Sequence, residues 1–328
     1  MRNMSEDARY DAERDILKVR RSYARGAESG YAAPQERGIL YMKKKIKIVT
    51  ADPAGNITIF ADEPFPRSEY QRVASQLLAM PELHGEQVAF IQKAPDCGRA
   101  DGKMEMCGLE FCGNASRSFG LLLAKRGGLQ GKGRIFVDVS GCNEILTIEV
   151  DTERDYTKVK MPNPREIRIF DLRELFAEPE FCPGEVARPE DLSAVRGVDF
   201  GGILHLILKD IPATESNFAV LRRAVYAECD PPAMGVMFCN TGERTLIPVV
   251  YVKDVDTTYF EGSCGSGSTA CAIAFSMNRP DGTYTYTFPQ PAGTIASTVV
   301  KTGGSVEKVF IEGTVQLSEP MEVEIELP

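Results

Sequence analysis

Short runs in which apolar and polar residues alternate fill most of the chain, and a few longer apolar stretches separate them. Alternation with a period of two is typical of half-buried strands, and the longer stretches are typical of helices. Short strands mixed with a few helices favour a mixed α/β (α+β) fold. The pattern predicts strands near residues 45–49, 57–60, 87–92, 134–139, 144–150, 156–161, 199–208, 234–239, 246–253, 284–288, 296–301 and 306–317.

Four segments after residue 44 are predicted to be helical. Ser68 and Gln71 form a capping-box signature ahead of a helix that carries Val73, Leu77 and Leu78. The segment "TESNFAVLRRAVYAE" predicts a second helix. Two largely apolar helices each open with cysteine and glycine, in "CGNASRSFGLLLAKRGG" and "CGSGSTACAIAFSMN". The first of these two ends at a glycine pair, as helices often do.

The two cysteine-led segments belong to a wider internal repeat. Helix, strand, glycine turn and strand recur in register, which indicates two α/β units of similar order. Cys264 lies 152 residues after Cys112, and the same offset relates Gly113 to Gly265, Ser116 to Ser268, Phe136 to Phe288 and Gly141 to Gly293.

The repeat suggests a division of the chain. Residues 1–44 are predicted to be an N-terminal extension, in which a charged amphipathic helix precedes a linker. The first unit is placed at 45–154, with the C-terminal strand 318–328 as a candidate to return to it. The second unit is placed at 155–317.

Composition narrows the classes of function. A net charge of −9 and a pI near 5.1 argue against nucleic-acid or anionic-membrane partners, which would repel such a protein. No apolar run is long enough to span a bilayer, and the charged start is unlike a signal peptide. We therefore expect a soluble cytoplasmic protein. Nine cysteines and no C-x-x-C pattern indicate reduced thiols and make a zinc site a poor fit.

Cys112 and Cys264 are the two candidate catalytic residues. A helix start carries unpaired N–H groups and partial positive charge, so a thiol there tends to ionise and a carboxylate tends to bind. If the two halves face each other, one thiolate can remove a Cα proton while the opposite thiol protonates the other face. The N–H groups would stabilise charge that spreads into the carboxylate, and neither a metal nor pyridoxal phosphate would be required.

At these residues a resemblance to a known family is found. "EFCGNASR" and "SCGSGSTA" resemble the two cysteine signatures of the diaminopimelate epimerase family of cofactor-independent racemases and epimerases. The likeness covers residues 45–317 and includes weaker matches at "AGN", "HGEQVAF" and "FGGILH". It implies two pseudo-symmetric domains, each a curved sheet around a central helix, with Cys112 and Cys264 as acid and base at their interface. The substrate-binding residues it implies are Asn56, Glu86, Gln87, Gly113, Asn114, His205, Gly265 and Ser266.

The substrate implied is an amino acid other than diaminopimelate. The segment "KDVDTTYFEGSCG" lacks the Glu-Arg pair with which diaminopimelate epimerases hold the distal end of their substrate. The segments "GLEFCGNA" and "EGSCGSGS" are similar to those of the histidine-racemase branch. This resemblance implies that Glu86 and Glu261 form hydrogen bonds with a polar side chain of the substrate. A solvated loop carboxylate remains an equal reading of Glu261, and an ordinary core histidine remains a reading of His205.

Three alternatives stay open at this point. They are a diaminopimelate epimerase, an isomerase of small acids with the same fold, and a non-catalytic amino-acid-binding protein. The presence of both cysteines favours the racemase over the last two, because a receptor has no use for two proton carriers. A homodimer is neither predicted nor excluded by the sequence.

Overall fold

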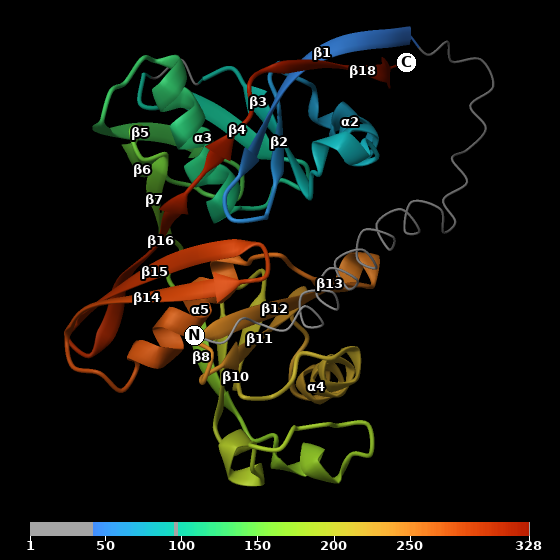
Figure 1. Cartoon of the computed structure of the whole chain (residues 1–328), viewed down its shortest axis with the longest axis vertical. Helices are drawn as coiled ribbons and strands as arrows, with labels where there is room; N and C mark the ends of the chain where they lie inside the picture. Colours follow the sequence, from blue (N-terminus) through green and yellow to red (C-terminus); the bar gives the residue numbers. More distant parts are fainter. Residues whose placement is uncertain (1–41, 95–97, 328) are drawn as a thin grey trace, which may run out of the picture.

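The computed structural model describes residues 42–94 and 98–327, and within them the chain forms two sheets and four α-helices. The helices are α2 (Tyr70–Leu78), α3 (Gly113–Arg126), α4 (Glu215–Glu228) and α5 (Gly265–Ser276). Figure 1 shows α2 and α3 in the upper half of the molecule and α4 and α5 in the lower half. None of these helices is long and apolar enough to cross a membrane. The predicted helix within residues 1–44 lies outside the described residues.

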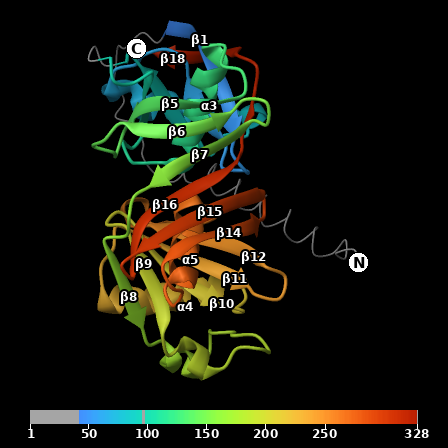
Figure 2. The same cartoon turned by 90° about the vertical axis from the view of Figure 1, so that its left-hand side faces the viewer.

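The larger sheet runs through both halves without a break. Its order is β14-β15-β16-β7-β6-β5-β4-β3-β2-β1-β17, and β18 also pairs with β1. Figure 2 shows β5, β6 and β7 above β16, β15 and β14 in one stack. Its strands are β1 (Met42–Asp52), β2 (Thr58–Ala61), β3 (Gln87–Gln92), β4 (Gly102–Met106), β5 (Lys132–Val139), β6 (Leu146–Asp151), β7 (Tyr156–Met161), β14 (Gly282–Gln290), β15 (Gly293–Thr302), β16 (Ser305–Thr314), β17 (Gln316–Leu317) and β18 (Met321–Leu327).

The smaller sheet belongs to the lower half. Its order is β13-β12-β11-β10-β9-β8, and it packs with α4 and α5. Its strands are β8 (Glu166–Phe170), β9 (Val195–Asp199), β10 (Leu204–Lys209), β11 (Ala233–Asn240), β12 (Thr245–Val252) and β13 (Thr257–Phe260).

The two cysteine-led helices share one hydrophobic core. Phe119 of α3 and Ile273 of α5 are fully buried in the same cluster, together with Val159 of β7 and Ile311 of β16. Val159 and Ile311 are directly paired across the β7–β16 ladder. That ladder therefore ties the halves together at the level of their central helices.

Three local expectations differ from the structure. The predicted strand 199–208 is two strands, β9 and β10, because Gly201 turns the chain at φ +85° while its N–H donates to Asp199. The capping box is wrong: Pro66 leads into a short 3₁₀ helix, η1 (Arg67–Glu69), so Ser68 lies before α2 and caps nothing. Residues 42–44, assigned to the extension, belong to β1.

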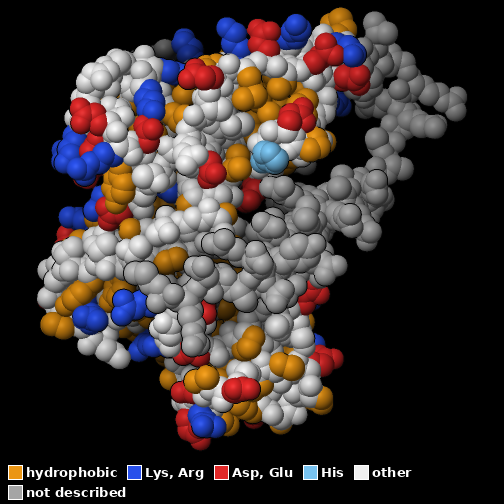
Figure 3. Space-filling view, in the orientation of Figure 1, with side chains coloured by type: hydrophobic (Ala, Val, Ile, Leu, Met, Phe, Trp, Pro, Cys, Tyr) orange, Lys and Arg blue, Asp and Glu red, His pale blue; other side chains and the backbone are white. Residues whose placement is uncertain are grey.

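The C-terminal strand lies beside the first one. β18 pairs antiparallel with β1, with Met42 opposite Leu327 and Ile48 opposite Met321. This brings residues after 317 into the upper half, while the boundaries 45–154 and 155–317 stay a prediction. On the face drawn in Figure 3, acidic and basic side chains of the described residues are interspersed, as a moderate net charge of −9 allows.

Candidate active site

Cys112 caps the N-terminus of α3. Its backbone is extended, with φ −127° and ψ 111°, and its Sγ accepts the N–H of Ala115 at 3.4 Å. Its carbonyl oxygen accepts the hydroxyl of Ser116 at 2.7 Å. The thiol thus replaces the usual side-chain oxygen of an N-cap residue.

Cys264 caps α5 in the same way. Its φ and ψ are −133° and 114°, its Sγ accepts the N–H of Gly267 at 3.4 Å, and its carbonyl accepts the hydroxyl of Ser268 at 2.7 Å. The repeated serines of the sequence, Ser116 and Ser268, therefore have one shared structural role.

The two helix N-termini converge on one side chain. A Cβ built on Gly113 would lie 2.9 Å from Ile311 Cδ1, and a Cβ built on Gly265 would lie 3.1 Å from the same atom. The Asn114 Oδ1 atom is 3.6 Å from that second Cβ position. At Gly113 a Cβ would also lie 2.5 Å from Met161 Sδ of β7, so a side chain there would displace its neighbours; at Gly265 the contact with Ile311 is tight but leaves more room.

A loop of the upper half meets the segment that precedes Cys264. Gly55 follows β1, and a Cβ on it would lie 2.0 Å from Ala292 Cβ in the β14–β15 turn. Gly262 packs on the same alanine, and a Cβ on it would lie 3.4 Å from Gly55 O and 3.8 Å from Glu86 Oε1. Glu86 and the loop at residues 54–56 thus lie beside the second cysteine segment.

An amide network surrounds Cys112. Gln87 Nε2 is 3.4 Å from Cys112 Sγ and donates to Asn56 Oδ1 at 2.9 Å and to Thr58 Oγ1 at 2.7 Å. Asn56 Nδ2 donates to Glu86 Oε2 at 3.3 Å, and Asn114 Nδ2 is 3.5 Å from Asn56 Oδ1. The predicted residues of the upper half therefore form one hydrogen-bonded group.

Cys264 has a different set of neighbours. The Ser266 hydroxyl lies 3.5 Å from Cys264 Sγ and 2.9 Å from Nε2 of His205, which is fully buried. His205 therefore lies behind Ser266, and burial lowers its pKa to about 3, which keeps the ring neutral. Glu261 also interacts with the Cys264 thiol, and burial raises the pKa of Glu261 to about 7.

The family model for the histidine racemase CntK N-terminal domain matches residues 45–320. A histidine racemase of Fusobacterium nucleatum subsp. nucleatum is 30% identical over 234 residues, which cover 69% of this chain and 79% of that protein. One from Staphylococcus aureus is 24% identical over 260 residues, which cover 78% of this chain and 89% of that protein. The chain belongs to the histidine racemase family.

Solved structures with low sequence identity to this chain share its fold. A hydroxyproline epimerase from Agrobacterium vitis superimposes with a TM-score of 0.57 at 12% identity, covering 88% of this chain and 95% of that one. A putative phenazine biosynthesis PhzC/PhzF protein from Clostridium difficile has a TM-score of 0.53 at 17% identity, covering 84% and 98%. These likenesses confirm the predicted fold class, and the family makes the chain an isomerase of the amino-acid racemase and epimerase class.

The thiols of this racemase differ in one respect from expectation. The sequence predicted that a helix N-terminus favours ionisation, yet burial raises the pKa of Cys112, although the N–H of Ala115 and the Gln87 amide oppose the rise. Burial raises the pKa of Cys264 further above its usual value, and the charge of Glu261 adds to the rise. Desolvation of a thiolate outweighs a few hydrogen bonds to it.

Sequence reasoning missed Arg117. This residue is part of the quoted "EFCGNASR" segment, and its side chain is fully buried beneath the start of α3. Its Nε donates to Asn114 Oδ1 at 3.1 Å. The available signal was a cation at the fifth position after Cys112, in the first half of a helix whose other charged residues, Lys125 and Arg126, lie in its last turn.

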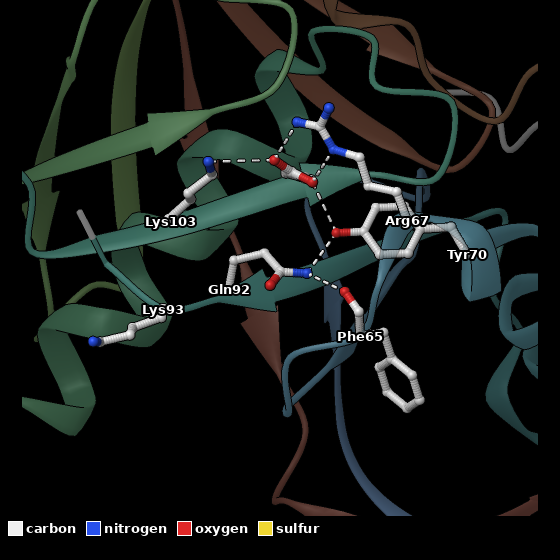
Figure 4. A pocket seen from close by; sticks show the side chains of 7 residues that line it. Phe65, Arg67, Tyr70, Gln92, Lys93 and Lys103 are labelled. Atoms are coloured by element: carbon white, nitrogen blue, oxygen red, sulfur yellow. Dashed lines mark hydrogen bonds and ion pairs between the residues drawn. The ribbon is translucent and has the colours of Figure 1, made fainter.

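A surface pocket lies elsewhere in the upper half and belongs to other segments. Its central carboxylate, Glu105, accepts hydrogen bonds from Arg67 at 2.7 and 3.0 Å and from Tyr70 at 2.8 Å (Figure 4). These partners, Arg67 first, lower the pKa of Glu105 to about 2. The pocket is lined by Phe65, Arg67, Tyr70, Gln92, Lys93, Lys103 and Glu105.

Proposed function

We propose that this chain is a racemase of histidine or a similar polar amino acid that needs neither pyridoxal phosphate nor a metal. Inversion at Cα would use Cys112 and Cys264 as its two acid-base groups. The observation that supports this proposal is the convergence of the two cysteine-capped helices on Ile311. The residue that follows each cysteine lies against the same isoleucine side chain.

The proposed reaction moves two protons. One thiolate takes the proton from Cα, and the electron pair of the broken C–H bond passes into the substrate carboxylate. The opposite thiol then gives its proton to the other face of Cα and becomes a thiolate. The product has the inverted configuration, and the two sulfur atoms have exchanged protonation states.

The substrate carboxylate would be held by backbone N–H groups at the two helix starts. Such groups carry partial positive charge and remain in place as negative charge grows on the carboxylate. They would be supplied by Gly113, Asn114, Gly265 and Ser266.

Recognition of the side chain would rest on Glu86 and Glu261. The Glu261 Oε2 atom is shielded from solvent and has no hydrogen-bond partner among the described residues. Glu86 Oε1 lies beside Gly262, the residue that follows Glu261. An imidazole has N–H groups that two carboxyl oxygens could accept, and the raised pKa of Glu261, about 7, is close to that of histidine. His205 would hold Ser266 in place from behind.

The experiment follows exchange at Cα. Purified protein is incubated in D₂O with L-histidine or D-histidine and no added cofactor, and the product is read by proton NMR and circular dichroism. We expect Cα deuteration and loss of optical activity, and an at least hundredfold loss of racemisation in Cys112→Ala and Cys264→Ala. Cys182→Ala is the matched control, because Cys182 is an exposed thiol.

The same assay tests the substrate. Twenty amino acids and diaminopimelate are compared under identical conditions. Rapid epimerisation of diaminopimelate would replace the histidine proposal with the alternative, and tight binding without Cα exchange would indicate a receptor. Full activity in Cys112→Ala would overturn the two-thiol mechanism.

A further inference from the structure

A buried cation lies beneath the first of the two thiol-bearing helix starts and has no equivalent at the second. Arg117 is fully buried, and the hydrogen bonds of its side chain within residues 42–94 and 98–327 all go to oxygen atoms of neutral groups. We propose that Arg117 is a positioning residue that makes the two thiols unequal: its charge stabilises an anion at the α3 N-terminus, so Cys112 ionises at a lower pH than Cys264 and is the thiolate of the active form, while Cys264 keeps its proton.

The guanidinium is held by neutral oxygen atoms from three segments that are distant in sequence. It donates to Pro53 O at 2.8 Å, to Gly313 O at 3.0 Å and to Thr314 O at 3.2 Å, and lies 3.4 Å from Thr157 Oγ1. Carbonyl dipoles satisfy its N–H groups but do not neutralise its charge. A buried charge whose hydrogen-bond partners are all neutral is costly, so an anion nearby is favoured.

Arg117 also fixes the amide network at Cys112. Its Nε–H donates to Asn114 Oδ1, which leaves the Asn114 NH₂ group to face Asn56 Oδ1. Asn56 Oδ1 in turn accepts Gln87 Nε2, whose amide also reaches Cys112 Sγ. Arg117 thus helps to orient Asn114 and Asn56, and the one side-chain amide of this network that reaches the first sulfur is that of Gln87, a donor that suits a thiolate.

The second half has the opposite electrostatics. The 152-residue offset places Thr269 opposite Arg117, and its hydroxyl donates to Gly265 O at 2.9 Å. The charged group beside Cys264 is the carboxyl of Glu261, whose interaction raises the pKa of that thiol. The sulfur at the helix start with a cation should therefore ionise at a lower pH than the sulfur at the helix start with a carboxyl group.

The other titratable groups near these side chains leave that difference in place. Glu110 acts on Cys112 from the preceding loop and raises its pKa, but less than burial does. Asp52 and Tyr156 act on Arg117, and burial raises the pKa of Tyr156 to about 12, so the phenol stays neutral. Near Cys264, Cys271 is a further buried thiol with a raised pKa.

The role of Arg117 in turnover rests on the proposed function. The test therefore measures the ionisation of each sulfur directly and does not depend on racemase activity. Full-length protein is alkylated with iodoacetamide between pH 5 and 10, and the rates at Cys112 and Cys264 are separated by peptide mass spectrometry. Because the two thiols differ in exposure, the pH midpoint of each rate is compared rather than the rate itself.

We expect a lower midpoint for Cys112 than for Cys264 in the native protein. Arg117→Met should raise the Cys112 midpoint by about one pH unit, which is a tenfold slower reaction at pH 7, while Arg117→Lys should keep most of the native value. Thr269→Val, at the equivalent helix position, should leave the Cys112 midpoint unchanged. Circular dichroism verifies that each variant is folded.

Three results would overturn the proposal: equal midpoints in the native protein, an unmoved Cys112 midpoint in folded Arg117→Met, or an equal shift in Arg117→Lys and Arg117→Met. If Arg117→Met does not fold, Glu261→Gln provides the second arm. It should lower the midpoint of Cys264 alone, and an unchanged Cys264 midpoint would contradict the asymmetry. If the alkylation midpoints are as expected but no racemisation is detected, the proposed function is wrong, whereas the effect of Arg117 on thiol ionisation is still supported.

Discussion

Two shielded carboxyl groups of this chain have opposite environments. Glu261 interacts with a thiol and has one oxygen without a partner among the described residues, and burial raises its pKa to about 7. Glu105 accepts hydrogen bonds from Arg67 and Tyr70, and these bonds lower its pKa to about 2. The environment of each side chain therefore decides the pH range over which it influences stability.

Glutamine substitutions at the two sites should have opposite pH dependence. A raised pKa in the folded state favours folding below the unfolded pKa, and this contribution is lost as the pH rises through about 7. Glu261→Gln should therefore become more stable relative to the native protein between pH 5 and pH 8, by up to about 3 kcal/mol. The measurement is urea unfolding followed by circular dichroism at each pH.

Glu105→Gln is the matched comparison. A lowered pKa contributes stability above the unfolded value, and this contribution is lost as the pH falls toward about 2. The variant should be less stable than the native protein at pH 7, and the difference should shrink toward pH 3. Parallel pH trends for the two variants would show that burial and hydrogen bonding have been assigned to the wrong groups.

At the scale of elements, the repeated glycines Gly141 and Gly293 have a common role. Gly141 lies in the turn after β5, and Gly293 is the first residue of β15, directly after the turn that follows β14. A Cβ on Gly141 would lie 2.2 Å from the backbone N of Phe111, directly before Cys112. A Cβ on Gly293 would lie 2.6 Å from Ala54 Cβ, in the loop that leads to Asn56. Both glycines therefore pack closely against segments that carry residues of the candidate site.

Gly141→Ala should therefore displace Cys112 as well as destabilise the fold. Gly141 has φ +68°, which costs an alanine about 1 kcal/mol, and the clash with Phe111 should add about 2 kcal/mol. Gly128→Ala is the control, because Gly128 has φ +72° but no atom within 4 Å of its Cβ position. Urea unfolding and the racemisation assay are compared for both. Equal losses in the two variants would show that the contact with Phe111 has no role.

At the scale of the whole molecule, the first and last described strands complete the upper half. Ile325 of β18 is buried with Ile46 and Ile48 of β1 in a hydrophobic cluster that also contains Leu77 of α2. The last residues of the chain thus supply core to its first strand. Stability of the upper half should depend on a segment that follows the entire lower half in sequence.

Ile325→Ala should lower the free energy of unfolding by about 3 kcal/mol, because it removes buried methyl and methylene groups and leaves a cavity. Glu322→Ala, at an exposed position of the same strand, should change it by less than about 0.5 kcal/mol. Urea unfolding of both variants is the measurement. A small effect of Ile325→Ala would mean that β18 is dispensable for the core of the upper half.

The sequence alone determined the features that are local along the chain. Four α-helices, most strands, and the repeat that pairs Cys112 with Cys264 could be predicted because helix signals and offsets need no knowledge of distant contacts. Two of the wrong expectations about secondary structure had local causes: Pro66 delays α2, and Gly201 divides one predicted strand into two.

The tertiary structure decided what depends on contacts between residues far apart in sequence. It placed Gly113 and Gly265 on one isoleucine, buried Arg117 among carbonyl groups of two segments distant in sequence, and joined both halves into one sheet through β7 and β16. It also reversed the expected direction of the thiol pKa shifts, because desolvation is set by everything packed around a sulfur atom and not by the helix that carries it.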